Sequence, residues 1–348
     1  MLEAAISRIV CAALGLLLLS ATRPGFPDSA SAFPPKLETY LSSVKLSTAD
    51  RKRLTDNAPV TRMLPADGSK EIAVFGAIWI YAPIARYIEA LNEIEHLESG
   101  PGYRVTRRIS THPVIGDFSA LHLTDSDFRA LRACRVGACD VKLWEGAIER
   151  FQHNINWNAA DARAAADALM QKLALEYVTA YLEGGNERLA IYRDKSRPRS
   201  VAEEFRSMLG GMPELTMFMP DMQHYLLDYP SVARPEPPSF LYWQDTEFGV
   251  KPTIRISHLT VREGTEETVV ASKMLYASHY FWTGIELRAL IPDPSRTAGF
   301  WFITVSRTRS DGLTGFAGAF VRHRVRSEVQ EKTSAGLLLT KQKLERAR

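Results

Sequence analysis

The feature that most restricts the fold of this chain is the stretch EIAVFGAIWIYAPIARYIEALNEIE, residues 71–95. Its first part is rich in β-branched and aromatic residues, which predicts a strand over 71–80. Pro83 fits the first turn of a helix, because its fixed φ suits that position and its missing N–H is not needed there. Apolar residues then recur at helical spacing over 84–97. The sequence therefore predicts a strand that leads directly into an amphipathic helix.

The first 32 residues have the pattern of a secretory signal peptide. A sparse positive region precedes the apolar run IVCAALGLLLLSA, which is too short to span a bilayer comfortably. The small residues Ala30, Ser31 and Ala32 match the requirement of a signal peptidase, so we expect cleavage before Phe33. An uncleaved N-terminal anchor is the alternative. We expect an exported protein, periplasmic or secreted, whose mature chain has no further membrane-spanning run.

Two cysteines, Cys134 and Cys139, follow the signal segment, and Gly137 between them permits a tight turn. Export implies an oxidising compartment, so we predict a disulfide, which in so short a loop stabilises the fold by only about 2 kcal/mol. A metal site is the alternative, but no neighbouring Cys or His supplies the remaining ligands. The spacing also excludes a C-x-x-C redox pair or haem motif. The sequence predicts no metal and no cofactor.

Composition narrows the functional class. The 348 residues are 45% apolar and 24% charged, which is ordinary for a globular protein. A net charge of only +3 argues against nucleic-acid binding as the main task, so no nucleic-acid partner is expected. The basic residues concentrate near the C-terminus, at Arg322, Arg324, Arg326, Lys332, Lys341, Lys343, Arg346 and Arg348.

The segments on either side of the opening stretch have their own patterns. Residues 33–70 are expected to form an N-terminal helical segment, in which Ser47 caps a short helix. A first half of the main domain is expected over 71–144. After the helix it holds strand candidates and, before the cysteines, a short helix in SDFRALRAC. The strand candidates are 103–110, 116–124 and 140–144.

In residues 145–237 the sequence pattern changes from strand-like to helical, which predicts a helical insertion. Its longest helix is expected to begin with Asn158 as N-cap, with Asp161 at the capping-box position, and to stop at Gly184-Gly185. Residues 238–348 then form the second half of the main domain, with a long helix over 313–346. We expect four strands in this half, over 252–261, 268–278, 281–291 and 299–309. The run from 267 to 291 is too long for one strand, so an interruption is expected inside it.

This order predicts an α+β fold, with a curved antiparallel sheet wrapped on a long C-terminal helix and a helical insertion between two halves. The stretch IWIYAPIARYIEALNEIE, the late run of strands and the terminal helix resemble the START-related helix-grip superfamily, also called SRPBCC. The resemblance covers roughly residues 70–145 and 238–346. It implies binding of a lipid, sterol-like or aromatic molecule. The insertion and the expected export depart from the usual pattern of that superfamily.

The late strands are rich in aromatic residues with polar tips, which suit a mostly apolar pocket that orients its ligand through a few hydrogen bonds. The alternative is that they are ordinary core and sheet residues. We take the following as candidate ligand-binding residues: His258, Tyr276, His279, Tyr280, Trp282 and Trp301.

The sequence assigns no catalytic residue. G-x-S-x-G, H-E-x-x-H, phosphate-loop and dinucleotide signatures are absent. The principal hypothesis is therefore non-covalent binding or transport of an apolar small molecule in a cavity between sheet and helix. The alternatives are an enzyme of the same fold, hydrolase or cyclase-like, acting on such a molecule, and a periplasmic interaction module.

Two further patterns leave alternatives open. Met217, Met219, Met222 and His224 are soft ligands that would suit Cu(I), although methionine also fills irregular apolar gaps. The basic residues of the terminal helix form either the solvated side of a core helix or a peripheral contact with an anionic membrane.

Overall fold

The computed structural model describes residues 32–346, apart from 219, 231–236, 249–250, 297 and 312–317. Residues from Phe33 onward belong to one unit. The expected signal peptide lies outside the described residues except for Ala32, so export stays a prediction. None of the described helices combines the length and the hydropathy that crossing a membrane requires.

Strand β2 (Glu71–Ile80) is buried along its whole length, as the opening stretch of the sequence predicts. Pro83 directly precedes helix α3 (Ile84–Asn92), which buries Tyr87 and Leu91. The predicted helix over 84–97 is broken at Glu93, and the short helix α4 (Ile94–Leu97) follows. The chain therefore passes from a buried strand into two consecutive helices.

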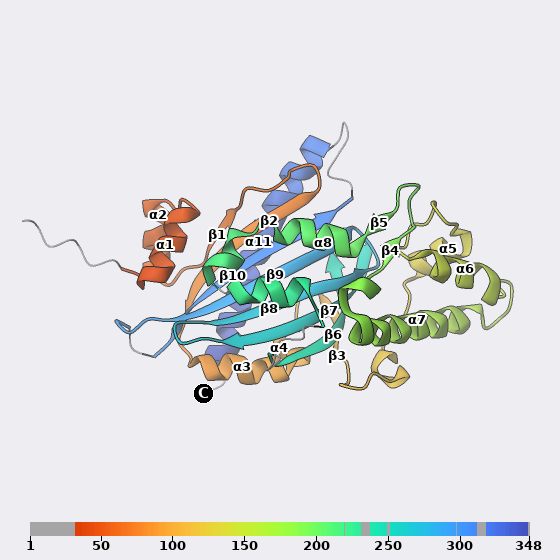
Figure 1. Cartoon of the computed structure of the whole chain (residues 1–348), viewed down its shortest axis with the longest axis horizontal. Helices are drawn as coiled ribbons and strands as arrows, with labels where there is room; N and C mark the ends of the chain where they lie inside the picture. Colours follow the sequence, from red (N-terminus) through yellow and green to blue (C-terminus); the bar gives the residue numbers. More distant parts are fainter. Residues whose placement is uncertain are drawn as a thin grey trace, which may run out of the picture. The chain divides into compact units, whose positions relative to one another are not determined.

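The main sheet has eight antiparallel strands in the order β1-β2-β10-β9-β8-β7-β6-β3 (Figure 1). Strand β2 pairs with the last strand, β10, over ten residue pairs, so the early and late parts of the chain build one sheet. This confirms the predicted α+β class, with a curved antiparallel sheet and a C-terminal helix. The bounds of the other strands are β1 Val60–Met63, β3 Tyr103–Arg108, β6 Ser239–Phe248, β7 Lys251–Glu263, β8 Thr268–Ala277, β9 Phe281–Pro292 and β10 Phe300–Ser310.

Helices cover both faces of this sheet. We call the face that bears Ile78, Leu290 and Phe302 the inner face; it packs against α3, α4 and α11 (Gly318–Arg346). The outer face bears Trp79 and Trp301 and packs against the remaining helices, because strand residues alternate between faces. In Figure 1 helix α8 lies in front of the sheet, on the outer face, and α11 lies behind it.

The outer face is covered by elements from two parts of the chain. The N-terminal helices are α1 (Pro35–Ser43), which was not predicted, and α2 (Thr48–Thr55), whose N-cap Ser47 accepts a hydrogen bond from the Asp50 N–H as its sequence indicates. The insertion supplies α6 Glu145–Asn154, α7 Ala162–Gly184, the 3₁₀ turn η2 Gly185–Arg188, the short pair β4 Ile191–Tyr192 and β5 Arg199–Ser200, α8 Val201–Leu209, α9 Pro213–Phe218 and α10 Pro220–Leu227.

Helix α7 begins later than the sequence predicts. Its N-cap is Asp161, without a side-chain capping bond, so the assignment of Asn158 as the cap is wrong. Its end at Gly184 is correctly predicted. Gly185 follows with a φ of 57°, and a Cβ there would collide with the Tyr229 carbonyl, so only glycine fits.

Two strand predictions in the first half of the domain are wrong. Residues 116–124 contain part of the 3₁₀ turn η1 (Ile115–Phe118), and the segment 140–144 joins only one isolated bridge, from Trp144 to Tyr192. The helix between them is confirmed as α5 (Asp125–Ala133). Strands β1 and β6 were not predicted.

Helix α11 lies along the edge of the inner face, over β1 and β2. It approaches β2 closely at Gly76, where a Cβ would meet Thr333 at 2.9 Å and Leu337 at 3.1 Å. Among its described side chains only Leu337 and Leu344 are fully buried. Helix α11 therefore covers one edge of the sheet and leaves the inner face of the central strands to other elements. The predicted helix residues 313–317 lie outside the described residues.

The predicted disulfide is present between Cys134 and Cys139, at the end of α5. Both cysteines are buried in the core under α7. The bond closes a local corner, which is held to the insertion by a hydrogen bond from the Cys139 N–H to the Asp194 carbonyl.

Candidate ligand site

The inner face of the sheet carries a buried cluster of charged and polar side chains at its centre. In β9, Glu286 and Arg288 point to the inner face, whereas Leu287 between them packs into the outer core. Strand β9 has neighbours on both sides, so these charges lie far from either edge of the sheet. Burying charges in such a place is costly unless each one is paired.

Arg288 is surrounded by three acceptors. Its Nη2 donates to Glu98 Oε1 at 2.6 Å, its Nε to Glu286 Oε1 at 2.8 Å, and its Nη1 to the Tyr87 hydroxyl at 3.1 Å. Burial alone would lower the pKa of Arg288, but the two carboxylates hold it well above its ordinary value. Burial raises the pKa of Tyr87 to about 12, so its hydroxyl stays protonated. Arg288 is thus a fixed cation at the centre of the cluster.

The cluster extends across the sheet toward β3. Gln244 of β6 donates from Nε2 to Glu98 Oε2 at 2.7 Å and accepts from Arg255 Nη2 at 2.9 Å. Thr106 of β3 donates to the Glu98 carbonyl at 2.6 Å. Thr106, Gln244 and Arg255 occupy matching register positions on β3, β6 and β7 and form one row on the inner face. Glu98, directly after α4, therefore joins α4 to the three strands β3, β6 and β9.

A pocket of about 190 Å³ opens beside this cluster, between α4 and β3. Its wall includes the buried residues Glu98 and Thr106 of the cluster. The full lining is Glu95, Glu98, Ser99, Tyr103, Arg104, Val105, Thr106 and Arg107. We call this pocket, together with Arg288, Gln244 and Arg255 behind it, the inner-face site.

Part of the inner face stays accessible. The side chain of Glu286 is 38% exposed, although it lies on a central strand. Ser306 and Thr308 on the adjacent strand β10 are half-buried, whereas their neighbours Val305 and Arg307 on the other face are buried. The helices of the inner face therefore do not seal the middle of the sheet.

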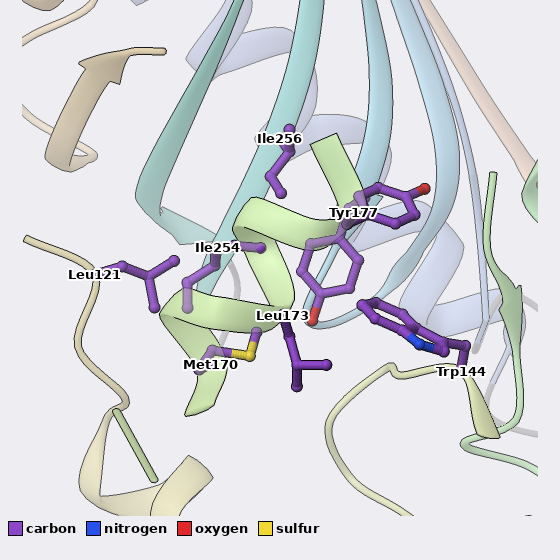
Figure 2. A pocket seen from close by; sticks show the side chains of 9 residues that line it. Leu121, Trp144, Met170, Leu173, Tyr177, Ile254 and Ile256 are labelled. Carbon is purple, nitrogen blue, oxygen red and sulfur yellow. The ribbon is translucent and has the colours of Figure 1, made fainter. Parts of the chain in front are cut away.

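A second pocket lies on the outer face under α7 and is apolar (Figure 2). Its accessible volume is about 10 Å³, roughly the space of one water, so it does not hold an organic ligand in this conformation. It is lined by Leu121, Trp144, Met170, Leu173, Ala174, Tyr177, Ile254, Ile256 and Tyr276.

The outer face also buries a lysine without a carboxylate. Lys273 of β8 is 1% exposed, and its Nζ donates to Asn186 Oδ1. The ammonium lies 4.5 Å from the centroid of the Phe205 ring and 5.4 Å from that of Tyr181. Burial lowers the pKa of Lys273 to about 7. No salt bridge joins it to a carboxylate of the described residues, so its charge is compensated only by dipoles and rings.

The six candidate residues of the sequence do not form one site. His258 is buried on the outer face, with Nδ1 3.0 Å from the Tyr181 hydroxyl, and burial together with Lys273 lowers its pKa to about 3. Tyr276 donates to the Lys142 carbonyl at 2.9 Å, and it alone of the six lines one of the two pockets.

The other four candidates are spread over two ends of the sheet. His279 lies between Asp127 Oδ1 at 2.9 Å and the Asp140 carbonyl at 3.0 Å, so both ring nitrogens are engaged. Trp282 donates to Asp311, and Trp301 donates to Asp293. The hydroxyl of Tyr280 accepts a hydrogen bond from the Lys251 N–H at 2.8 Å.

A turn between β8 and β9, where Tyr280 has a φ of 58°, explains this dispersal. It confirms the predicted interruption in the long run. Because of it, Tyr276, Tyr280 and Trp282 do not alternate along one strand.

Sequence reasoning missed the charged cluster. The signal was in the segment IELRALI, where Glu286 and Arg288 alternate with apolar residues inside a strand that must be buried. Glu98 gave no such signal, because it lies just before a Gly-Pro-Gly turn and resembles an ordinary helix end.

The methionine cluster belongs to the core. Met222 is fully buried in the outer-face cluster, and Met217 packs against it, whereas Met219 lies outside the described residues. Within the described part of the chain, no group of three or more His, Cys, Asp or Glu side chains is placed to hold a metal ion.

Two lysines of the basic terminal helix donate hydrogen bonds to other groups of the protein. Lys341 donates to the Trp79 carbonyl at 2.8 Å and to Glu345, and Lys343 donates to carbonyls at the end of α4. Arg324 and Arg326 are exposed. Contact of α11 with an anionic membrane stays a prediction.

Compared with known proteins, the chain has no significant match to a family model, to a curated protein sequence or to a solved structure.

Proposed function

We propose that residues 71–346 form a helix-grip domain with a helical insertion, and that this domain binds a small organic molecule at the inner-face site. The order of elements supports the proposal. The first long strand lies beside the last one, two helices connect β2 to the opposite edge strand β3, and the terminal helix packs on β2. This arrangement is the one expected from the resemblance to the helix-grip superfamily. Its ligand cavity is expected on the face of the sheet that the helices cover.

The observation that carries the proposal is the Arg288–Glu98 pair next to an open pocket. Two charges buried in the middle of a sheet face are often no more stabilising than apolar residues of similar size. Their presence is better explained if they hold the polar wall of a ligand pocket in place, because a few fixed polar groups in an otherwise packed wall provide specificity.

The shape of the ligand follows from the surroundings of the site. Beside the charged cluster the inner face is apolar, with Leu91, Ile94 and Leu97 of the helices packed on Tyr242 and Leu259 of the strands. The ligand is therefore a small amphipathic molecule, with a polar end in the pocket between α4 and β3 and an apolar part against Tyr103 and Val105 of the pocket wall. Binding is non-covalent, and the protein acts as a carrier or receptor outside the cytoplasm.

Native mass spectrometry of the gently purified protein tests this function. Ser99→Trp fills the pocket from its rim, and Ser207→Trp places the same side chain on the exposed side of α8 as a matched control. We expect a bound small molecule on the wild type and on Ser207→Trp, and none on Ser99→Trp. Equal occupancy of all three proteins, or a wild type that carries nothing and binds no member of a lipid and aromatic library, contradicts the proposal.

A further inference from the structure

Two donors at the inner-face site lack acceptors within the described residues. Arg288 satisfies its guanidinium with three acceptors, whereas Arg255 makes one hydrogen bond, to Gln244, and its buried Nε has no partner. Tyr103, which lines the pocket, makes no hydrogen bond through its hydroxyl to any described residue. The Arg255 Nε is buried, and a buried donor without an acceptor destabilises a protein by about 1–3 kcal/mol, so this atom indicates a missing partner.

The two donors lie near each other on the inner face, because Tyr103 pairs with Thr246 of β6 and Arg255 pairs with Gln244, two residues away on the same strand. Burial raises the pKa of Tyr103, the charge of Glu98 raises it further, and the nearby charge of Arg255 lowers it. The net result keeps the Tyr103 hydroxyl protonated at neutral pH. A guanidinium can only donate hydrogen bonds, and a protonated phenol beside it has its proton to give.

The charges of the site exclude one class of ligand group. Glu98 and Glu286 are balanced by Arg288 and Arg255, and Glu98 already has both carboxylate oxygens engaged. The lower pKa of Glu286 arises because Arg288 and Arg255 outweigh the effect of its burial. An ammonium group placed at the Arg255 Nε would bring a second donor and a second positive charge to a guanidinium, whereas an oxygen group would accept its hydrogen bond.

We propose that Arg255 and Tyr103 together hold an oxygen acceptor of the ligand, so that the bound molecule carries a carbonyl or carboxylate group at its polar end. This inference rests on the proposed function and specifies its ligand class. The oxygen of a planar carbonyl or carboxylate group presents lone pairs in the directions that a guanidinium edge and a phenol can both reach. The ligand thereby supplies the acceptor that the described residues do not give to the Arg255 Nε.

Four small probes of one ring size separate the possibilities: acetophenone, benzoate, ethylbenzene and benzylammonium. Ethylbenzene has nearly the shape of acetophenone without its oxygen, so the difference between them reports the acceptor alone. We expect acetophenone or benzoate to bind the wild type at least about tenfold more tightly than ethylbenzene, with benzylammonium weakest, by isothermal titration calorimetry or ligand-observed NMR. Tighter benzoate identifies a carboxylate ligand, and tighter acetophenone a neutral carbonyl.

Variants test whether the preference for oxygen-bearing probes depends on Arg255 and Tyr103. Tyr103→Phe removes only an oxygen and should weaken the oxygen-bearing probe about fivefold while leaving ethylbenzene unchanged. Arg255→Gln should act in the same direction, and Tyr81→Phe, an exposed tyrosine outside the pocket, should change nothing. Tyr103→Phe provides the test even if Arg255→Gln does not fold.

The proposal is overturned if ethylbenzene binds as tightly as both oxygen-bearing probes, if Tyr103→Phe behaves like Tyr81→Phe, or if no probe binds. The native mass spectrometry of Ser99→Trp decides independently whether the site binds a small molecule at all. A small molecule lost from Ser99→Trp together with no preference for oxygen-bearing probes would therefore reject the ligand class and retain the function.

Discussion

Glu98 Oε1 lies 2.6 Å from Arg288 Nη2, and this pair joins the end of α4 to a central strand across 190 residues of sequence. Both side chains are buried. Removing the carboxylate would leave a buried guanidinium that retains only Glu286 and Tyr87. We therefore expect Glu98→Ala to lower the free energy of unfolding by about 3 kcal/mol, measured by urea denaturation.

Glu95→Ala is the matched control for this variant. Glu95 lies three residues away on α4, but its carboxylate is exposed; it lies 4.0 Å from Arg107 and accepts one hydrogen bond, from the Arg108 N–H at 3.2 Å. Its removal should change the free energy of unfolding by less than about 1 kcal/mol. An equal and small effect of both substitutions would show that the buried pair is not organised as described.

Lys273 makes stability depend on pH in the alkaline range. Its pKa is about 7 in the folded protein and has the ordinary value of 10.5 when exposed. Between these values the unfolded chain binds a proton that the folded protein does not. The free energy of unfolding therefore increases steadily as the pH is raised from 7 toward 10.5. We expect the wild type to gain up to about 3 kcal/mol between pH 7 and pH 9.5 relative to Lys273→Met.

Other titratable groups near Lys273 do not change their charge in this pH range. His258 has a pKa of about 3 and stays neutral throughout the range, and burial raises the pKa of Tyr181. Lys273→Met should also be more stable than the wild type at pH 7, because it removes a buried charge that has no carboxylate partner among the described residues. Lys142→Met, at a buried lysine that does pair with Asp194 and Asp311, should instead be destabilising. Parallel pH profiles for the wild type and Lys273→Met would refute the assignment.

The disulfide should contribute little to global stability. Cys134 and Cys139 are separated by only five positions, so the closed loop restricts the unfolded chain weakly. We expect the double variant Cys134→Ala/Cys139→Ala to lose about 2 kcal/mol and to keep the native circular dichroism spectrum. Complete unfolding on reduction at 25 °C would mean that this corner supports far more of the fold.

Lys343 connects α11 to the end of α4, at the rim of the pocket. Its Nζ donates to the carbonyls of His96, Leu97 and Ser99 at distances of 2.8–3.0 Å. Lys343→Met should lower the free energy of unfolding by about 1–2 kcal/mol, reduced from the value of a buried contact because the site is partly exposed. Lys332→Met, in the exposed i,i+4 pair with Glu328, should cost less than about 0.5 kcal/mol. The same loss for both lysines would contradict the role of Lys343.

The sequence predicts the local elements of this fold better than its long-range partners. The strand before Pro83, the end of α7 at Gly184 and the interruption near Tyr280 all depend on local propensity and backbone geometry, and each is found. Segment 116–124 is rich enough in apolar residues to resemble a strand. It forms instead a turn and an extended loop, in which Leu121 and Leu123 join the core without strand pairing.

The candidate site was predicted on the wrong basis for a physical reason. Aromatic residues such as Trp301 and Tyr276 are prominent in the sequence, but in a sheet covered on both faces they are needed for packing. Glu98 and Arg288 become neighbours only when α4 meets β9, and no spacing in the sequence encodes that contact. Charged residues that alternate with apolar ones inside a buried strand are the signal to seek.

An X-ray structure of the natively purified wild-type protein is the most direct test of ligand binding at the inner-face site. We expect density for a non-protein molecule in the pocket between α4 and β3, with an oxygen atom within hydrogen-bonding distance of Arg255 Nε and of the Tyr103 hydroxyl. Density for protein side chains or isolated waters alone at these two donors, in a protein that also binds none of the probes, would contradict it.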